Sequence, residues 1–132
     1  MDNTLEEVVA LSWQFNRTEA VFLQIEKRLK REILVGKYPP DSQFPSVRQL
    51  AAEVAVNPNT MQKALLLLEN EGLLYSKGTL GRFVTSDAQT LRNAKDEMQK
   101  EVVTTLLAQA RELGISGKEL IEYIEMEEDQ NG

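Results

Sequence analysis

Polar side chains that can hydrogen-bond to nucleic-acid bases gather near the middle of the chain, directly after Val56. They are Asn57, Asn59, Thr60, Gln62 and Lys63. Asparagine and glutamine can each form two hydrogen bonds with adenine, threonine offers a hydroxyl and a methyl group, and lysine neutralises a phosphate. Together on one exposed edge, these residue types are suited to reading a groove of duplex DNA.

The residue types on which most enzymes depend are missing from the sequence. It contains no histidine and no cysteine, which removes the commonest general base, the thiol nucleophile and the usual transition-metal ligands. Acidic pairs such as Glu127 and Glu128 are adjacent on a predicted helix and therefore point apart. Gly78 and Gly81 match no phosphate-binding glycine motif. We expect no catalytic activity, no metal site and no cofactor.

A short helix is the first element needed to position the polar residues. Ser46 with Gln49 has the pattern of a capping box, in which each side chain bonds to the backbone N–H of the other residue. Apolar residues then recur at helical spacing, and they are Val47, Leu50, Ala51 and Val54. A helix over 47–54 is expected, with Arg48 on its solvent-exposed face.

A second helix should follow after a very short turn. Asn57 suits its N-cap, and Pro58 suits the first helical position, where no amide hydrogen is needed. Gly72 should end it in a left-handed conformation. Its inward stripe is Met61, Ala64, Leu65 and Leu68, which leaves the polar residues outside. Two helices that cross steeply over so short a turn form a helix-turn-helix.

A β-hairpin is expected after the second helix. The strand candidates are 73–76 and 82–85, with a glycine-bearing turn between them. Lys77, Gly78 and Arg82 lie at this turn, where the two cations can face phosphates or the minor groove. A helix-turn-helix followed by such a wing makes duplex DNA the leading candidate partner.

The residues from Pro45 to Val84 resemble the winged-helix domain of the GntR family of bacterial transcriptional regulators. The matching pattern is PSVR, LA, VNPNT, AL, LE, EGLLY and a glycine-bearing wing, and the likeness extends back to Phe22. By position, the resemblance implies DNA contacts from Arg48, Asn57, Asn59, Thr60, Gln62, Lys77 and Gly78. Lys63 is added from helix geometry, and Ser46 and Arg82 complete the DNA-binding candidates.

Three positions depart from the family pattern. Ala55 stands where a turn glycine is usual, so a left-handed residue here would cost on the order of 1 kcal/mol unless the turn is shaped differently. Gln62 replaces a frequent arginine and Leu66 a common charged residue, which reduces the expected phosphate contacts. Leu66 or Leu67 must then face something other than the usual core.

The length of 132 residues allows one compact domain with an appendage. We expect an N-terminal extension over 1–18, a winged helix-turn-helix domain over 19–85 and a helical dimerisation arm over 86–132. The fold class is therefore mainly α with a small β-hairpin. This organisation resembles the short YtrA-like subfamily, whose C-terminal part is a pair of helices.

The arm should consist of two amphipathic helices. Ser86 with Gln89 and Ser116 with Glu119 have the pattern of capping boxes, and Gly114 should end the first helix. Such helices cannot bury their apolar stripes alone, which predicts a symmetric homodimer on a palindromic operator. The dimerisation candidates are Leu91, Met98, Val102, Leu106, Ala110, Leu113, Leu120, Ile121 and Ile124.

The net charge of −6 hides a contrast along the chain. Residues 19–85 hold nine Lys or Arg against seven Asp or Glu, whereas residues 86–132 hold five against eleven. The acidic arm should be repelled by DNA, and the weakly positive winged domain should bind it with modest, salt-sensitive affinity.

Other segments favour structural interpretations. The cluster Lys27, Arg28, Lys30 and Arg31 is interpreted as a solvated helix face. Tyr75 is interpreted as a strand residue packed on the helix that begins at Pro58, which is the expected recognition helix. Trp13 and Phe15 fit a short strand or core-sealing segment better than a base-stacking platform. Residues 1–12 are either a helical extension or a frayed end.

These features favour a cytoplasmic, sequence-specific transcriptional regulator, a repressor that binds double-stranded DNA as a homodimer. No apolar run approaches the length of a membrane span. A small-molecule effector and control by concentration alone both remain open, because no residue identifies a ligand. The alternative function is a winged-helix protein–protein interaction module without DNA binding.

Overall fold

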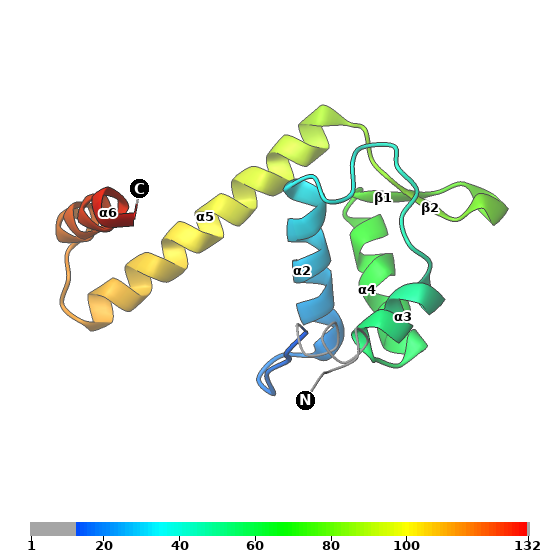
Figure 1. Cartoon of the computed structure of the whole chain (residues 1–132), viewed down its shortest axis with the longest axis horizontal. Helices are drawn as coiled ribbons and strands as arrows, with labels where there is room; N and C mark the ends of the chain where they lie inside the picture. The colour runs from blue at the N-terminus through cyan, green and yellow to red at the C-terminus, as the bar shows by residue number, and fades with distance from the viewer. Residues whose placement is uncertain (1–12, 132) are drawn as a thin grey trace. The chain divides into compact units, whose positions relative to one another are not determined.

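The computed structural model describes residues 13–131, which divide into two compact units, 13–92 and 93–131. The first unit contains α2 (Val21–Leu34), α3 (Val47–Val54), α4 (Pro58–Asn70), β1 (Leu74–Ser76), the 3-10 turn η1 (Gly78–Leu80) and β2 (Arg82–Val84) (Figure 1). Helix α5 (Ala88–Glu112) begins in the first unit and continues into the second, which also contains α6 (Gly117–Asn131). The expected fold class, mainly α with one small hairpin, is confirmed.

Helix α4 is the centre of the first unit and packs against α2, α3 and β1. Its predicted inward stripe is confirmed, because Met61, Ala64, Leu65 and Leu68 are completely buried. They meet Ile25 and Leu29 of α2, which are also fully buried, in one apolar core. Leu66, in contrast to these apolar residues of α4, is 41% exposed.

The predicted start and end of α3 are confirmed by its caps. The backbone N–H of Gln49 donates to Ser46 Oγ at 3.1 Å, as in a capping box. At the other end, Ala55 adopts the left-handed conformation with φ 62° and ψ 49°, so it keeps the turn shape that a glycine would favour. Val54, the residue before it, is buried in the core.

Helix α4 begins at Pro58, as predicted. Asn57 is its N-cap, and the Asn57 Oδ1 atom accepts from the backbone N–H of Asn59 at 2.8 Å. The helix ends at Asn70, and Gly72 follows with φ +81°. Its N–H donates to the Glu69 carbonyl at 3.0 Å, which satisfies a carbonyl of the last turn.

The wing is a two-stranded antiparallel hairpin with Leu74 opposite Val84, Tyr75 opposite Phe83 and Ser76 opposite Arg82. The segment 41–44 lies along the free edge of β2, because Gln43 forms an isolated bridge with Phe83. The rings of Tyr75 and Phe83 stack at 6.0 Å, and the Tyr75 hydroxyl donates to Asp41 Oδ1 at 3.0 Å. Tyr75 is therefore a half-buried strand residue whose ring contacts the opposite strand.

One local expectation is wrong, and of the two alternatives for Trp13 and Phe15 the strand is excluded. Helix α5 begins at Ala88, so its cap is Asp87 and not Ser86: the Asp87 carbonyl accepts from Leu91 N, and its Oδ2 accepts from the Thr90 hydroxyl at 2.6 Å. That hydrogen bond, foremost, holds the pKa of Asp87 below its usual value. The alternation at Trp13 and Phe15 does not form a strand.

Trp13 and Phe15 instead form a half-buried aromatic pair on the surface of α2. Their ring centroids lie 6.1 Å apart, and the Arg28 guanidinium lies 3.9 Å from the Trp13 ring. The contact is a cation–π interaction, and it involves Arg28, one of the four cations predicted to form a solvated face of this helix. The expectations for residues 1–12 lie outside the described residues.

The second unit leaves most of its large apolar side chains exposed. Ser116 caps α6, because Glu119 N donates to Ser116 Oγ at 3.2 Å, and the Glu119 side chain accepts from the Ser116 hydroxyl rather than from its backbone N–H. Ala110 is the one buried residue that α5 has, and α6 has none among its described residues. The exposed apolar side chains are Val102, Val103, Leu106, Leu113, Ile121, Tyr123, Ile124 and Met126.

No helix within residues 13–131 combines the length and the apolar character that crossing a membrane requires.

A buried carboxylate joins α2 to the end of α4. Glu26 is 3% exposed, and Lys30 Nζ lies 2.9 Å from Glu26 Oε1 and 2.7 Å from Glu71 Oε2. Burial, followed by a hydrogen bond with Glu71, raises the pKa of Glu26 to about 7. Burial lowers the pKa of Lys30, but its hydrogen bonds with Glu71 and Glu26 outweigh that effect and raise it.

This raised pKa predicts that stability falls with rising pH. The ionised form of Glu26 is less favourable in the folded chain than in the unfolded chain, so unfolding becomes easier between pH 4.5 and about 7. Glu26→Gln should remove that loss. The free energy of unfolding of the variant, measured relative to that of the wild type, should therefore rise by about 1–3 kcal/mol between pH 5 and pH 8. Urea unfolding at both pH values measures this shift.

Glu19→Gln is the matched control, because Glu19 pairs with Lys27 at the surface. It should show a much smaller shift, since exposed ion pairs contribute little. Parallel pH profiles for the wild type and Glu26→Gln would contradict the assignment.

Candidate nucleic-acid interface

The outer edge of α4 carries the predicted polar side chains. Asn59 and Lys63 are exposed, and Thr60 and Gln62 are half-buried. The buried stripe fixes the rotation of the helix, so these four side chains must lie on its outer side, over its first two turns. Their amide, hydroxyl and ammonium groups form a row of hydrogen-bonding groups of the kind that base edges and phosphates accept.

Asn57 and Ser46 lie at helix N-termini, where their side-chain oxygens already accept backbone hydrogen bonds. The Asn57 amide N–H₂ group and the Ser46 hydroxyl hydrogen keep their capacity to donate. Arg48, in the first turn of α3, is exposed. The sequence-predicted residues of α3 and α4 therefore present donors, beside helix ends that themselves attract anions.

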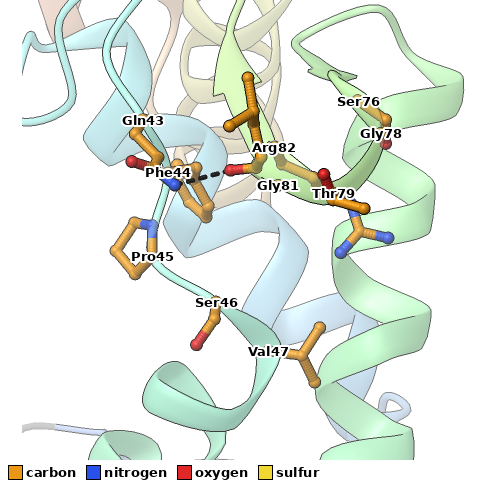
Figure 2. Close-up of a pocket in the computed structure, with 11 residues that line it drawn as sticks. Gln43, Phe44, Pro45, Ser46, Val47, Ser76, Gly78, Thr79, Gly81 and Arg82 are labelled. Atoms are coloured by element: carbon orange, nitrogen blue, oxygen red, sulfur yellow. Dashed lines mark hydrogen bonds between the residues drawn. The ribbon is translucent and has the colours of Figure 1, made fainter.

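A cleft of about 460 Å³ separates the start of α3 from the wing. Figure 2 shows the chain from Gln43 to Ser46 running beside the wing, with the Phe44 N–H donating to the Arg82 carbonyl at 2.8 Å. Ser46, Gly78 and Arg82 line this cleft together. The fold thus brings Ser46 from the start of α3 and Gly78 and Arg82 from the wing to one depression.

Lys77 and Gly78 lie at the exposed tip of the wing. The Lys77 ammonium lies 4.5 Å from the centre of the Phe83 ring and 5.5 Å from that of Tyr75, so the aromatic strand pair holds it in place. Gly78 has φ +55° and starts the 3-10 turn η1.

Arg82 has a different setting from the other candidates. Its side chain is 17% exposed, and its Nε lies 3.8 Å from Glu69 Oε1 on α4. It therefore faces the recognition helix and not the tip of the hairpin, and a carboxylate compensates its charge.

The cations of the first unit differ in how they are compensated. On α2, Lys27 pairs with Glu19 at 2.9 Å, and Arg28 pairs with Glu32 at 3.5 Å. Within residues 13–131, by contrast, no Asp or Glu forms an ion pair with Arg48, Lys63 or Lys77. Among residues 13–131, Arg31 of α2 also has no carboxylate in an ion pair, but α3, α4 and the wing are the elements that carry the predicted polar residues, and there the positive charge is open to an anionic partner.

Two residues that hold the wing were not identified from the sequence. Glu69 contacts Arg82, and Gln43 Nε2 donates to the Leu80 carbonyl at 2.7 Å. Gln43 and Leu80 are far apart in the chain, and no local pattern links them. The sequence places Glu69 on the last turn of α4 but does not reveal its partner.

No cluster of three or more potential metal ligands occurs among the residues that the structure describes.

The known proteins to which this chain is similar are described as regulatory proteins or regulators of transcription. The sequence profile of a family described as "Bacterial regulatory proteins, gntR family" matches residues 22–84. "Uncharacterized HTH-type transcriptional regulator YhcF" of Bacillus subtilis (strain 168) is 30% identical over 111 residues, which cover 84% of this chain and 92% of that protein. "HTH-type transcriptional repressor YtrA" of the same organism is 34% identical over 105 residues, covering 79% and 81% respectively.

A solved structure, "GntR family transcriptional regulator from Listeria monocytogenes", has the same fold. Its TM-score with this chain is 0.79 at 26% identity, and the match covers 85% of this chain and 98% of that chain.

The interface predicts separable effects for a base-reading and a phosphate-binding side chain. Asn59→Ala should weaken binding to a preferred duplex by about tenfold and leave binding to random duplex unchanged, because one base contact is lost. Arg48→Ala should weaken both and lower the slope of log affinity against log salt by about 0.9, because one phosphate contact is lost. Fluorescence anisotropy titrations at several salt concentrations measure both quantities.

Arg31→Ala is the matched control, because Arg31 is an exposed cation on α2. It changes the net charge equally but should leave the salt slope unaltered. If Arg31→Ala and Arg48→Ala gave the same slope, Arg48 would have no place in the interface.

Proposed function

The chain belongs to the gntR family of bacterial regulatory proteins, and from this membership we propose that it is a transcriptional repressor that binds an inverted-repeat operator as a homodimer. It is a DNA-binding regulator of transcription, as its relatives are. The repressor assignment follows the printed name of YtrA. The proposed location is the cytoplasm, because the duplex DNA of a bacterium lies there, and no catalytic activity is proposed.

The observation that carries the DNA-binding surface is the distribution of uncompensated cations. Arg48, Lys63 and Lys77 come from three different elements, yet none has a carboxylate partner among residues 13–131. Lys63 lies on the same helix as Asn59, Arg48 lies in the first turn of α3, which packs against α4, and Lys77 lies at the tip of the wing. We assign Asn59, Thr60 and Gln62 to base edges. We assign phosphate contacts to Ser46, Arg48, Asn57, Lys63, Lys77 and Gly78.

Arg82 receives a supporting assignment instead. Its guanidinium lies against Glu69 and has little exposed surface. A DNA contact from this side chain would have to break that pair first.

A salt titration separates this function from a protein-interaction module. Random-sequence duplex should bind at low salt and lose affinity steeply as salt rises, because bound phosphates release counterions. Anisotropy of a labelled duplex at two salt concentrations measures the loss. Absence of binding at low salt, or affinity that does not respond to salt, would favour the alternative in which the motif binds a protein.

Dimerisation is supported by the unsatisfied apolar stripes of α5 and α6. Val102 is 63% exposed, Leu106 38%, Ile121 58% and Ile124 39%, which is unusual for aliphatic side chains on helices. Pairing with a second chain would remove this apolar surface from water. Leu91, Met98 and Leu120 are half-buried and can join the same contact.

Ala110 is the exception among the dimerisation candidates. It is 5% exposed, and the turn after α5 closes over it, since Ile115 N donates to the Ala110 carbonyl at 2.9 Å. Its side chain therefore has little surface to offer a second chain.

The arm predicts that a charge at its apolar stripe disrupts the dimer. Val102→Glu should weaken self-association at least about tenfold, because a carboxylate would have to be buried at the contact. Thr104→Glu adds the same charge on the opposite side of α5 and should leave the dimer intact. Light scattering at micromolar concentration measures both masses. A dimeric Val102→Glu, or equal dissociation by the two variants, would remove this stripe from the interface.

A further inference from the structure

A single carboxylate on α4 contacts both strands of the wing. Glu69 Oε1 accepts a hydrogen bond from the Ser76 hydroxyl, and Arg82 Nε lies 3.8 Å from the same oxygen. Ser76 and Arg82 are directly opposite each other in the hairpin, and theirs is the last pair before the tip. The wing is therefore attached to the recognition helix at the point where it leaves the body of the domain.

The two charged side chains are partly shielded from water, whereas Ser76 is exposed. The side chains of Arg82 and Glu69 are 17% and 26% exposed. At 3.8 Å the Arg82–Glu69 contact is an ion pair and not a hydrogen bond, and an ion pair in such a setting is stronger than one between fully exposed side chains. Glu69 belongs to the last turn of the same helix whose first turns carry Asn59 and Gln62.

The other edge of the wing is held from the segment before α3. Gln43 Nε2 donates to the Leu80 carbonyl at 2.7 Å, and Phe44 N donates to the Arg82 carbonyl at 2.8 Å. With Glu69 on one side and this segment on the other, the tip of the wing has little freedom to rotate about its base.

From these contacts we propose that Glu69 is a positioning residue for DNA recognition, one that fixes the orientation of the wing relative to the recognition helix. The inference rests on the proposed function. Glu69 itself does not contact DNA. By holding Arg82 and Ser76, it sets where the Lys77 ammonium lies when the polar edge of α4 is in the groove. Preorganised geometry of this kind improves binding without adding a contact to the ligand.

The proposal opposes simple electrostatics, which makes it testable. Removing a carboxylate from a DNA-binding domain raises its positive charge, and this alone should strengthen binding. If Glu69 positions the wing, Glu69→Gln should instead weaken binding to the preferred duplex by about fivefold, because a neutral amide no longer attracts the Arg82 guanidinium, although its oxygen can still accept from the Ser76 hydroxyl. Binding to random duplex should stay equal or become tighter, so the ratio of specific to non-specific affinity should fall.

Glu53→Gln is the matched control, since Glu53 is exposed on α3. It makes the same change in charge and should leave the affinity ratio unchanged. Ser76→Ala removes a contact to Glu69 without changing the charge, and it should lower the ratio in the same direction as Glu69→Gln. It also serves if Glu69→Gln fails to fold by circular dichroism.

A double-mutant cycle with Lys77 identifies the route of the effect. Lys77→Gln should cost affinity for the preferred duplex in the wild type, but markedly less in the Glu69→Gln background, because the cation is already misplaced there. Additive effects of the two substitutions would overturn the positioning role, and so would tighter specific binding by Glu69→Gln. Failure of the wild type to bind any duplex would instead overturn the proposed function.

Discussion

The packing of α4 against three neighbours is the constraint on which the rest of the structure depends. Met61, Ala64, Leu65 and Leu68 are completely buried against α2, α3 and β1, so the helix can neither rotate nor slide without opening the core. Because the inner face is fixed, the outer face is fixed as well, and it is the face that carries Asn59 and Gln62. The core thus determines which side chains are available to a partner.

The cations of the first unit differ in whether a carboxylate lies beside them. On α2, carboxylates pair with Lys27, Arg28 and Lys30, and the buried Glu26 shares Lys30 with Glu71 from the end of α4. Arg82 of the wing forms an ion pair with Glu69 of α4. What remains uncompensated among residues 13–131 includes Arg48, Lys63 and Lys77, on the three elements that carry the proposed interface. A weak net charge is therefore compatible with a locally positive surface.

Local sequence signals predicted the elements better than the contacts between them. The caps at Ser46, Asn57 and Ser116 act within a few residues, and the helices that they start were found correctly. The start of α5 was misplaced because two neighbouring residues can both cap a helix. The contact between Glu69 and Arg82 was out of reach, since hydrophobic periodicity carries no information about which polar side chains meet after folding.

The central claim is that the outer edge of α4 reads a DNA sequence. Selection of bound duplexes from a random library by the full chain tests it most directly, because binding and sequence preference are read in one experiment. The account predicts enrichment of a short motif that occurs as two inverted copies, spaced by about one helical turn or a multiple of it. A bound pool that retains the base composition and lack of pattern of the starting library would contradict it.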